Sequence, residues 1–211
     1  GQTDVYPVVD TAEGLVAMVQ NGAVEFHVWG SRVSAIEVPD MLVFDLDPGP
    51  DVPWRRVREA ARTLRDELRD RGLESYLRTS GGKGLHVVAP YTSRARWPRV
   101  GAFARDVVET LAAREPARYT ATMSKAKRSG KVFIDHFRNG RGATSVASYS
   151  LRARPGAPVA MPIEWDELGR TKGGNDWTLE RVLRRLRTRT TDPWEDFFET
   201  GRRQKLPDEG R

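Results

Sequence analysis

Apolar side chains recur along this chain of 211 residues with two different periods, and these periods predict the order of its elements. Short apolar runs favour strands at residues 24–29, 41–46, 73–78, 85–89, 131–137 and 143–152. Apolar positions three and four residues apart favour helices at residues 12–20, 53–71, 99–114, 163–168, 179–187 and 193–200. Strands and helices alternate without strict βαβ regularity. We therefore expect an α+β fold with mixed or antiparallel sheets flanked by helices.

The remaining stretches are expected to be irregular. Residues 116–131 are polar and basic and are predicted to form a long loop. Residues 201–211 have the composition of a flexible tail. The sequence shows no internal repeat and no long linker, so we expect one folded domain over residues 1–200.

The composition narrows the class of protein. The chain has no cysteine, which excludes disulfide bonds and thiolate metal ligands. Its net charge of +6 and pI near 9.9 favour a polyanionic partner such as nucleic acid. No stretch reaches the roughly 20 apolar residues that cross a bilayer, and no secretory signal opens the sequence. We expect a cytoplasmic protein without a membrane partner.

The most informative stretch is the apolar run from Met41, which ends in Asp45-Leu46-Asp47-Pro48. Side chains alternate faces along a strand, so the two carboxylates share a face, roughly 6–7 Å apart at Cα. Pro48 lacks an amide donor and is expected to end the strand. Paired carboxylates at an open strand end suit Mg²⁺ or Mn²⁺. The alternative is that both aspartates only form a turn, since Asp-Pro-Gly-Pro is strong turn chemistry.

A glycine-rich turn follows at Ser80-Gly81-Gly82-Lys83-Gly84-Leu85-His86. Its glycines allow a close approach of the backbone, and its amides are expected to point toward an anion. Lys83 adds a charge, Ser80 a hydroxyl and His86 a ring N–H donor. The spacing is not that of a Walker loop. The alternative is a flexible hairpin in which His86 is structural.

A third acidic residue, Asp135, lies within the apolar run Val132 to Phe137. A charge in such a strand is costly to bury unless it is paired or bound to a metal ion. Asp135 is therefore a candidate to complete a three-carboxylate site with Asp45 and Asp47. Such a site holds two ions about 3.5–4 Å apart in phosphoryl transfer. The alternative is a salt bridge to Arg138 or another arginine. His136 alternates to the opposite face and is expected to be structural.

Two basic clusters accompany these motifs. If the strand at 143–152 continues, Arg152 and Arg154 share a face, and two guanidinium groups side by side suit a triphosphate. The alternative is a solvated edge strand. The stretch before Asp135 carries four cations, which are either solvated or grip a nucleic-acid backbone: Lys125, Lys127, Arg128 and Lys131.

Taken in order from Val8 to Leu206, these motifs resemble the archaeo-eukaryotic primase superfamily. They resemble most closely the polymerase domain of the bacterial non-homologous end-joining ligase, ligase D, and its stand-alone relatives. The resemblance implies a primase-polymerase (RRM-like) catalytic core. Family members usually carry roughly 80–90 further residues before the point where this sequence begins. The resemblance therefore implies an N-terminally short domain, in which template positioning is in doubt.

The same resemblance assigns roles to single residues. It implies that Asp45, Asp47 and Asp135 bind two Mn²⁺ or Mg²⁺ ions, typically with Mn²⁺ preferred. It also implies that the basic cluster aligns a DNA end. The residues implied to hold the incoming nucleotide are His27, near its sugar, and Ser80, Lys83, His86, Arg138, Arg152 and Arg154, around its phosphates.

The activity implied is template-directed nucleotidyl transfer at DNA ends or gaps during double-strand break repair, with NTPs accepted beside dNTPs. The partners implied are DNA ends as template and primer, with a DNA ligase domain and the Ku end-binding protein, near the bacterial nucleoid. Two alternatives remain. One is a catalytically silent module that binds DNA ends and recruits a ligase. The other is a two-metal phosphoesterase, for which the arginine pair Arg152 and Arg154 would be unnecessary.

Overall fold

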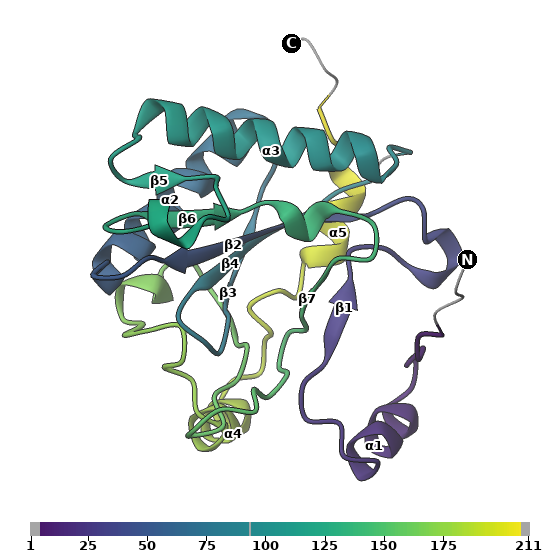
Figure 1. Ribbon diagram of the computed structural model, residues 1–211. Coiled ribbons are helices and arrows are strands. Elements are labelled where there is room, and N and C mark those ends of the chain that lie inside the picture. The colour runs from purple at the N-terminus through teal and green to yellow at the C-terminus, as the bar shows by residue number, and fades with distance from the viewer. Residues whose placement is uncertain (1–4, 93, 208–211) are drawn as a thin grey trace.

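The computed structural model describes residues 5–92 and 94–207, and in this part of the chain six strands form one central sheet (Figure 1). Strand β2 (Met41–Pro48) lies between β6 (Val132–Asp135) and β4 (Leu85–Pro90). Next to β4 lie β3 (Tyr76–Thr79) and then β8 (Pro162–Ile163), while β5 (Tyr119–Thr120) borders β6. β5 and β6 are parallel and the other neighbours antiparallel, so the sheet is mixed, as the sequence predicts.

One face of this sheet carries the hydrophobic core. Leu42, Phe44 and Leu46 alternate along β2 onto this face, and each is fully buried. They pack against α2 (Trp54–Asp70) and α3 (Trp97–Arg114), whose apolar stripes the sequence predicts. Burying one such side chain contributes roughly 1.5–3 kcal/mol. The core therefore fixes which face each residue of β2 presents.

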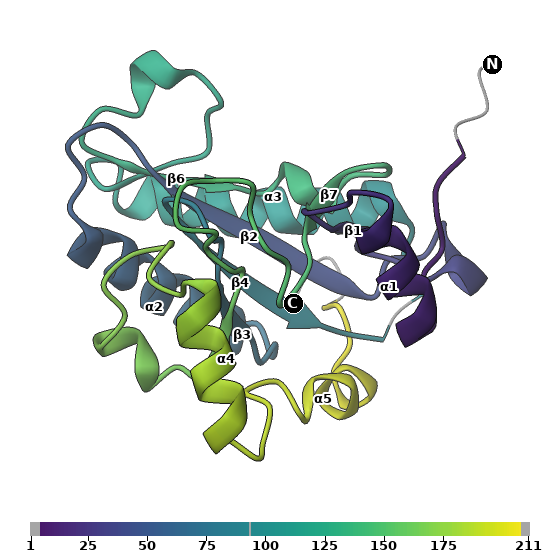
Figure 2. The ribbon, with the colours of Figure 1, turned by 90° about the horizontal axis from the view of Figure 1, so that it is seen from below.

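The opposite face is divided into an apolar end and a polar end. At the apolar end, Val43 and Val88 pack against Phe197 of α5 (Phe197–Arg203). At the polar end lie Asp45 and Asp47, beside a separate two-stranded sheet of β1 (His27–Trp29) and β7 (Thr144–Val146). Figure 2 shows α4 in front of the sheet and α3 behind it.

Two further helices lie at the periphery (Figure 1). Helix α1 (Ala12–Gln20) begins at Thr11, whose hydroxyl accepts a hydrogen bond from the Gly14 amide, and every residue of α1 is at least partly exposed. Helix α4 is Leu179–Thr188. The described residues include no helix with the length and apolar character needed to cross a membrane. Short 3₁₀ helices complete the fold: η1 (Val33–Ala35), η2 (Lys125–Lys127), η3 (Phe137–Asn139) and η4 (Glu167–Gly169).

Three of the expected elements are wrong. The strand expected at 143–152 ends at Val146, because Tyr149 takes a left-handed backbone angle (φ 65°) that turns the chain away. The helix expected at 163–168 is replaced by β8 and the single turn η4. The expected loop 116–131 contains β5 and η2, since the amide of Val132 bonds to the carbonyl of Arg118.

The end of the chain is also more ordered than its composition suggests. Helix α5 begins four residues later than the expected 193–200 helix and runs past Thr200 to Arg203. Gln204 then donates hydrogen bonds to the carbonyls of Glu74 and Pro90, and Leu206 is buried. The packed domain therefore extends through at least Leu206, and the flexible tail predicted from Gly201 is wrong for this stretch. Residues 208–211 lie outside the described residues.

A buried asparagine holds η3 against the central strand. The Asn139 side chain accepts from the amide of Val43 at 2.8 Å and donates to the carbonyl of Val43 at 2.8 Å. It also donates to the carbonyl of His136 at 2.8 Å. Asn139 thus continues the ladder of β2 after β6 has ended, and it fixes the position of Arg138 next to the polar end of the sheet.

Asn139→Ala is expected to lower the free energy of unfolding by about 2–4 kcal/mol, because both polar groups of Val43 would be left buried without partners. Urea denaturation followed by circular dichroism measures this change. Asn21→Ala is the matched control, since Asn21 also donates to a carbonyl, that of Ala17, but is exposed. Its change is expected within about 0.5 kcal/mol. Equal changes in both variants would contradict the role given to Asn139.

Candidate active site

Four ionisable side chains lie in one row across the polar end of the sheet. The strand register places Asp45 opposite Asp135 on β6 and opposite His86 on β4. His86 in turn lies opposite Arg78 on β3. Directly opposed residues of antiparallel strands point to the same face. Residues far apart in the sequence, Asp135, Asp45, His86 and Arg78, are thereby brought side by side.

Asp47 lies on the same face, two residues further along β2, where it opposes Phe133. A cavity of about 200 Å³ opens above the two aspartates of β2. Asp45 and Asp47 both line this cavity, whereas Asp135 is not among its lining residues. Its other lining side chains include most of the residues singled out from the sequence: His27, Ser80, Lys83, His86, Arg138, Arg152 and Arg154.

The three carboxylates sit in an electrostatically crowded place. Burial and the charges of Asp45 and Asp135 raise the pKa of Asp47 to about 6. Burial also raises the pKa of Asp135, although the Phe137 amide and Arg138 oppose this shift. Burial alone would raise the pKa of Asp45, but His86 and Arg138 hold it below its ordinary value. The polar end of the sheet thus accumulates negative charge and requires cationic neighbours.

Arg138 supplies one of these cations. Its Nε lies 3.3 Å from a carboxylate oxygen of Asp135, and one of its terminal nitrogens lies 3.6 Å from Asp45. The salt bridge that the sequence leaves open as an alternative for Asp135 is therefore present. It does not exclude a metal site, because the Arg138 side chain is 39% exposed and can withdraw into solvent.

The contact between His86 and Arg78 fixes the protonation of the imidazole. An arginine can only donate, so Nδ1 of His86, 2.9 Å from Arg78, must be the acceptor. The ring proton then lies on Nε2, which is 3.5 Å from a carboxylate oxygen of Asp45. Burial lowers the pKa of His86, in agreement with a neutral ring. His86 can thus present one N–H to the cavity, but not two.

The glycine-rich turn corrects one expectation. Its amides do not point toward an anion, because they are bonded within the protein. The Gly82 and Gly84 amides donate to the Ser80 hydroxyl, and the Gly81 amide donates to the carbonyl of Gly174. The Ser80 oxygen accepts twice and retains its proton for a ligand. At this turn, side chains and not these amides remain open to a ligand, with Lys83 exposed at its tip.

The glycines serve close packing instead. Gly81 has φ +65°, and a Cβ there would lie 2.5 Å from Cγ of Arg152. A Cβ on Gly84 would lie 2.1 Å from the carbonyl oxygen of Leu46. Larger residues at these two positions would push Arg152 and strand β2 away from the turn.

The two arginines reach the cavity by a route that the sequence does not predict. The strand that was expected to align Arg152 and Arg154 ends at Val146, so alternation along a strand does not place them. Instead, Nη1 of Arg152 donates to the carbonyl of Ser80 at 2.6 Å. A Cβ on Gly82 would lie 3.6 Å from Nη1 of Arg154. Both guanidinium groups thus border the glycine-rich turn.

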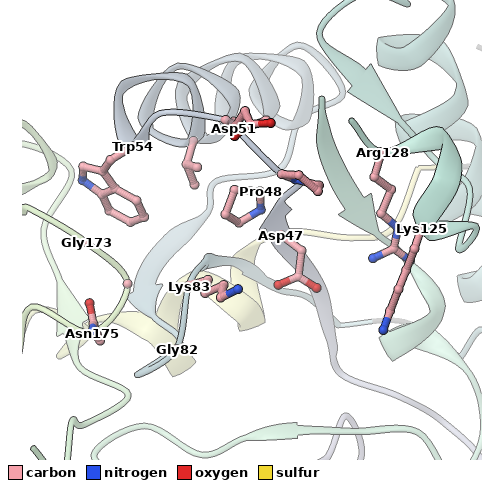
Figure 3. Close-up of a pocket in the computed structure, with 15 residues that line it drawn as sticks. Asp47, Pro48, Asp51, Trp54, Gly82, Lys83, Lys125, Arg128, Gly173 and Asn175 are labelled. Atoms are coloured by element: carbon pink, nitrogen blue, oxygen red, sulfur yellow. The ribbon is translucent and has the colours of Figure 1, made fainter. Parts of the chain in front are cut away.

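Two residues of the basic cluster, Lys125 and Arg128, line a second, larger hollow of about 720 Å³ next to Asp47, and Lys127 and Lys131 are not among its lining residues. Figure 3 shows Asp47 between Lys83 on one side and Lys125 and Arg128 on the other, with Trp54 at the far wall. The guanidinium of Arg128 lies 3.6 Å from the ring centroid of Phe133 and donates to the carbonyls of Thr122 and Met123. Arg128 is therefore part of the loop's own structure.

The sequence analysis did not identify Arg78 and Glu25. Arg78 is almost completely buried, and burial lowers its pKa to about 10, so it remains charged at neutral pH. Glu25 lies 3.0 Å from both His27 and Arg152. A signal existed for each: Arg78 is a charged residue ending an apolar run, and Glu25 lies two positions before His27, on the same face of the expected strand.

Whether the three carboxylates could hold a metal ion depends on their placement and on their chemistry. In the described part of the chain, no three His, Asp or Glu side chains stand close enough together to hold a metal ion as they are placed. The donor set nevertheless suits a hard cation, since Asp45, Asp47 and Asp135 share a face and two of them are directly opposed. Oδ1 of Asp45 is buried and has no hydrogen-bond partner among the described residues. We conclude that the residues fit a divalent cation once Arg138 withdraws.

Comparisons with known proteins show the family of this chain. Residues 1–194 match the family described as "LigD, primase-polymerase domain". The chain is 43% identical over 202 residues to the multifunctional non-homologous end joining protein LigD of Pseudomonas aeruginosa, covering 94% of this chain and 24% of that protein. It is 40% identical over 174 residues to the Mycobacterium tuberculosis DNA repair protein LigD, covering 79% and 23%. The chain thus spans about a quarter of the length of these curated relatives.

A solved structure shows the same fold. The polymerase domain of Mycobacterium tuberculosis ligase D, determined in complex with DNA, superposes with a TM-score of 0.81 at 36% identity. The match covers 91% of this chain and 69% of that one. The α+β architecture expected from the sequence and the resemblance it carries are both confirmed. The chain belongs to the LigD primase-polymerase domain family.

Proposed function

We propose that this domain catalyses template-directed nucleotidyl transfer at DNA ends or gaps in non-homologous end joining, with NTPs accepted beside dNTPs. One observation carries the proposal. Asp45, Asp47 and Asp135 share one face of the sheet, and cationic side chains surround the cavity that Asp45 and Asp47 line. Joining a nucleotide to a strand requires both parts, anions to hold divalent cations and cations to hold the triphosphate.

The three carboxylates are the proposed ligands of two Mn²⁺ or Mg²⁺ ions. Their support is the crowding that raises the pKa of Asp47 and the unpartnered Oδ1 of Asp45. A pair of divalent cations held there would activate a 3′-hydroxyl and offset the charge on the phosphates. Arg138 competes for the same oxygens of Asp45 and Asp135 and is expected to leave them when a cation binds.

The cationic side chains of the cavity are the proposed triphosphate site. Lys83, exposed at the tip of the glycine-rich turn, is a mobile point charge. Arg152 and Arg154 offer guanidinium groups, which bind phosphate oxygens in pairs. Arg138, once released, adds a further charge close to the reacting phosphate. Ser80 has one proton available for the same ligand, His86 lines the cavity with its ring proton directed at Asp45, and His27 borders the cavity from β1.

DNA is the proposed partner of the basic cluster. Lys125 and Arg128 line the hollow that begins at Asp47, and Trp54 offers an indole ring within it. A strand in this hollow would bring its end to the carboxylates. The similar solved polymerase domain was determined with DNA, which supports this partner. The relatives are named as non-homologous end joining proteins, which supports, as a further proposal, action beside a ligase in that repair process. The Ku end-binding protein stays a prediction from the sequence resemblance.

Asp45→Ala and Asp135→Ala are each expected to reduce primer extension by about 100-fold or more, because each removes charge that holds the reacting groups. Extension of a recessed primer with Mn²⁺ and NTPs is measured on denaturing gels. Asp70→Ala, an exposed aspartate at the end of α2, is the control and should extend normally. Undiminished extension by either site variant would contradict the proposal. Shortened strands instead of extended ones would indicate a phosphoesterase, and DNA binding without incorporation a silent binder.

Asp47→Asn is expected to stabilise the metal-free protein while abolishing extension. With its folded-state pKa raised to about 6, ionised Asp47 opposes folding above that pH. The penalty fades as the pH falls from about 6 toward 4, where the carboxyl is protonated in the folded state and about half protonated in the unfolded state. We expect a Tm gain of a few degrees at pH 7–8 in EDTA, and a much smaller gain at pH 4. Thermal unfolding across this range measures it, and a gain that does not change with pH would contradict the charge argument.

Lys125→Gln with Lys127→Gln is expected to weaken DNA binding without changing stability, because both side chains are exposed. Each lost phosphate contact should lower the salt slope of log K by about 0.9. Fluorescence anisotropy at several salt concentrations measures the slope. Lys205→Gln, an exposed lysine beyond α5, is the control. Arg128→Gln should instead lower the Tm, since Arg128 packs on Phe133. An unchanged slope in the double variant would exclude this loop as a DNA contact.

A further inference from the structure

One acidic side chain, Glu25, joins several parts of the cavity wall. Its Oε2 accepts from Nε2 of His27 and from Nε of Arg152, both at 3.0 Å. Its Oε1 accepts from the backbone amide of Ala153 at 2.8 Å. Glu25 does not itself line the cavity, whereas His27 and Arg152 do. A carboxylate just outside the site thus holds two of the side chains that form it.

We propose that Glu25 is a positioning residue for the nucleotide site, which aims the guanidinium group of Arg152 and the ring of His27 at the phosphates and sugar of the incoming nucleotide. The inference rests on the proposed function and deepens it. It assigns Glu25 no contact with substrate.

The orientation of Arg152 is the first argument. Its Nε donates to Glu25 and its Nη1 donates to the carbonyl of Ser80 at 2.6 Å. Two donors on different edges of a planar guanidinium group, each tied to a fixed acceptor, leave the plane no freedom to turn. The remaining nitrogen, Nη2, has no hydrogen-bond partner among the described residues and is available to a phosphate oxygen. Without Glu25, the side chain would pivot about its bond to Ser80.

The second argument is that the residue at this position is a glutamate. An ionised carboxylate accepts hydrogen bonds but donates none, so it meets the three donors that surround it here. Hydrogen bonds from His27, the Ala153 amide and Arg152 lower the pKa of Glu25 to about 2, so it is ionised over the whole physiological range. The side chain of Arg152 is only 15% exposed. A hydrogen bond to a charged group in such surroundings contributes far more than a surface ion pair.

The third argument is that Glu25 couples the two sheets. Around it, the Phe26 amide donates to the Ser150 hydroxyl and the Ala147 amide donates to the Phe26 carbonyl, both at 2.8 Å. These bonds and the β1–β7 pairing already fasten the small sheet. The carboxylate adds what they do not: a link through Arg152 to Ser80 at the end of β3 in the main sheet. Its charge is therefore needed for alignment more than for folding.

The test is steady-state extension and equilibrium nucleotide binding by Glu25→Gln. Glutamine keeps the shape but presents an amide where Arg152 requires an acceptor. We expect the KM for NTP, and the Kd for NTP measured by calorimetry without primer, to rise about tenfold or more. The Kd for primer–template DNA should stay within about twofold. Glu37→Gln is the control. Glu37 also pairs with an arginine, Arg141, at a distance of 2.7 Å, but neither residue lines the cavity.

A double-mutant cycle with Arg152→Lys tests whether Glu25 acts on nucleotide binding through Arg152. Lysine retains the charge but cannot hold a fork between Glu25 and Ser80, so Arg152→Lys alone should raise the KM as Glu25→Gln does. In the Arg152→Lys background, Glu25→Gln should add less than about twofold. Additive effects, or an unchanged KM and Kd in Glu25→Gln, would overturn the inference. If melting shows Glu25→Gln to be unfolded, Arg152→Lys decides, and an unchanged KM there overturns it.

Failure of the proposed function gives a different result. A wild-type protein that incorporates no nucleotide contradicts the proposed function, yet nucleotide binding that weakens in Glu25→Gln would still support the positioning role. A wild-type protein that neither incorporates nor binds NTP overturns both proposals. An active wild-type protein with an unaffected Glu25→Gln variant overturns only the role of Glu25.

Discussion

The structure depends on a charge balance within one row of the central sheet. Asp135, Asp45, His86 and Arg78 oppose one another across four strands, and all four are buried. Removing even one such charge from water costs several kcal/mol unless a partner offsets it. Arg78 and Arg138 flank the acidic residues, while neutral His86 bonds to Arg78 and approaches Asp45 through its ring proton. The sheet thus holds acidic oxygens in a place where they are only partly neutralised.

Such a row is possible because the hydrophobic core on the other face of the sheet stabilises the fold. Leu42, Phe44 and Leu46 are fully buried against α2 and α3, and alternation along β2 then gives the opposite face to Asp45 and Asp47. A slip of one residue in the register would bury both carboxylates in hydrocarbon, so the core itself enforces the position of the site. Helix α5 covers the opposite face only around Val43 and Val88, which leaves the acidic end open.

The sequence correctly predicted strand β2 with its two aspartates near the end, from signals that the structure confirms. The apolar run before Asp45 and the proline after Asp47 are local signals, and β2 indeed ends at Pro48. The pairing of Asp45 with Asp135 is different, because register between strands 90 residues apart is set by the whole sheet. The motif order suggested that these residues meet, but periodicity alone could not place them opposite each other.

Other parts of the site were found by their residue types but explained wrongly. The glycine-rich turn was expected to offer its amides, yet those of Gly81, Gly82 and Gly84 are bonded within the protein. Arg152 and Arg154 were expected to share the face of a strand, which the left-handed Tyr149 prevents from continuing. Sequence reasoning recognises which side chains suit a phosphate. It cannot tell which backbone groups remain free, because that depends on loops distant in the sequence, such as the one at Gly174, whose carbonyl accepts a hydrogen bond from the Gly81 amide.

Arg138 connects this charge balance to the proposed ligands. It offsets Asp45 and Asp135 from a partly exposed position, in a 3₁₀ turn that Asn139 holds against β2. A divalent cation, if bound as proposed, would offer the same oxygens a higher charge at closer range, so Arg138 could move aside without leaving the acidic residues unpaired. Because Arg138 also lines the cavity, its guanidinium would then be free to pair with a bound phosphate group.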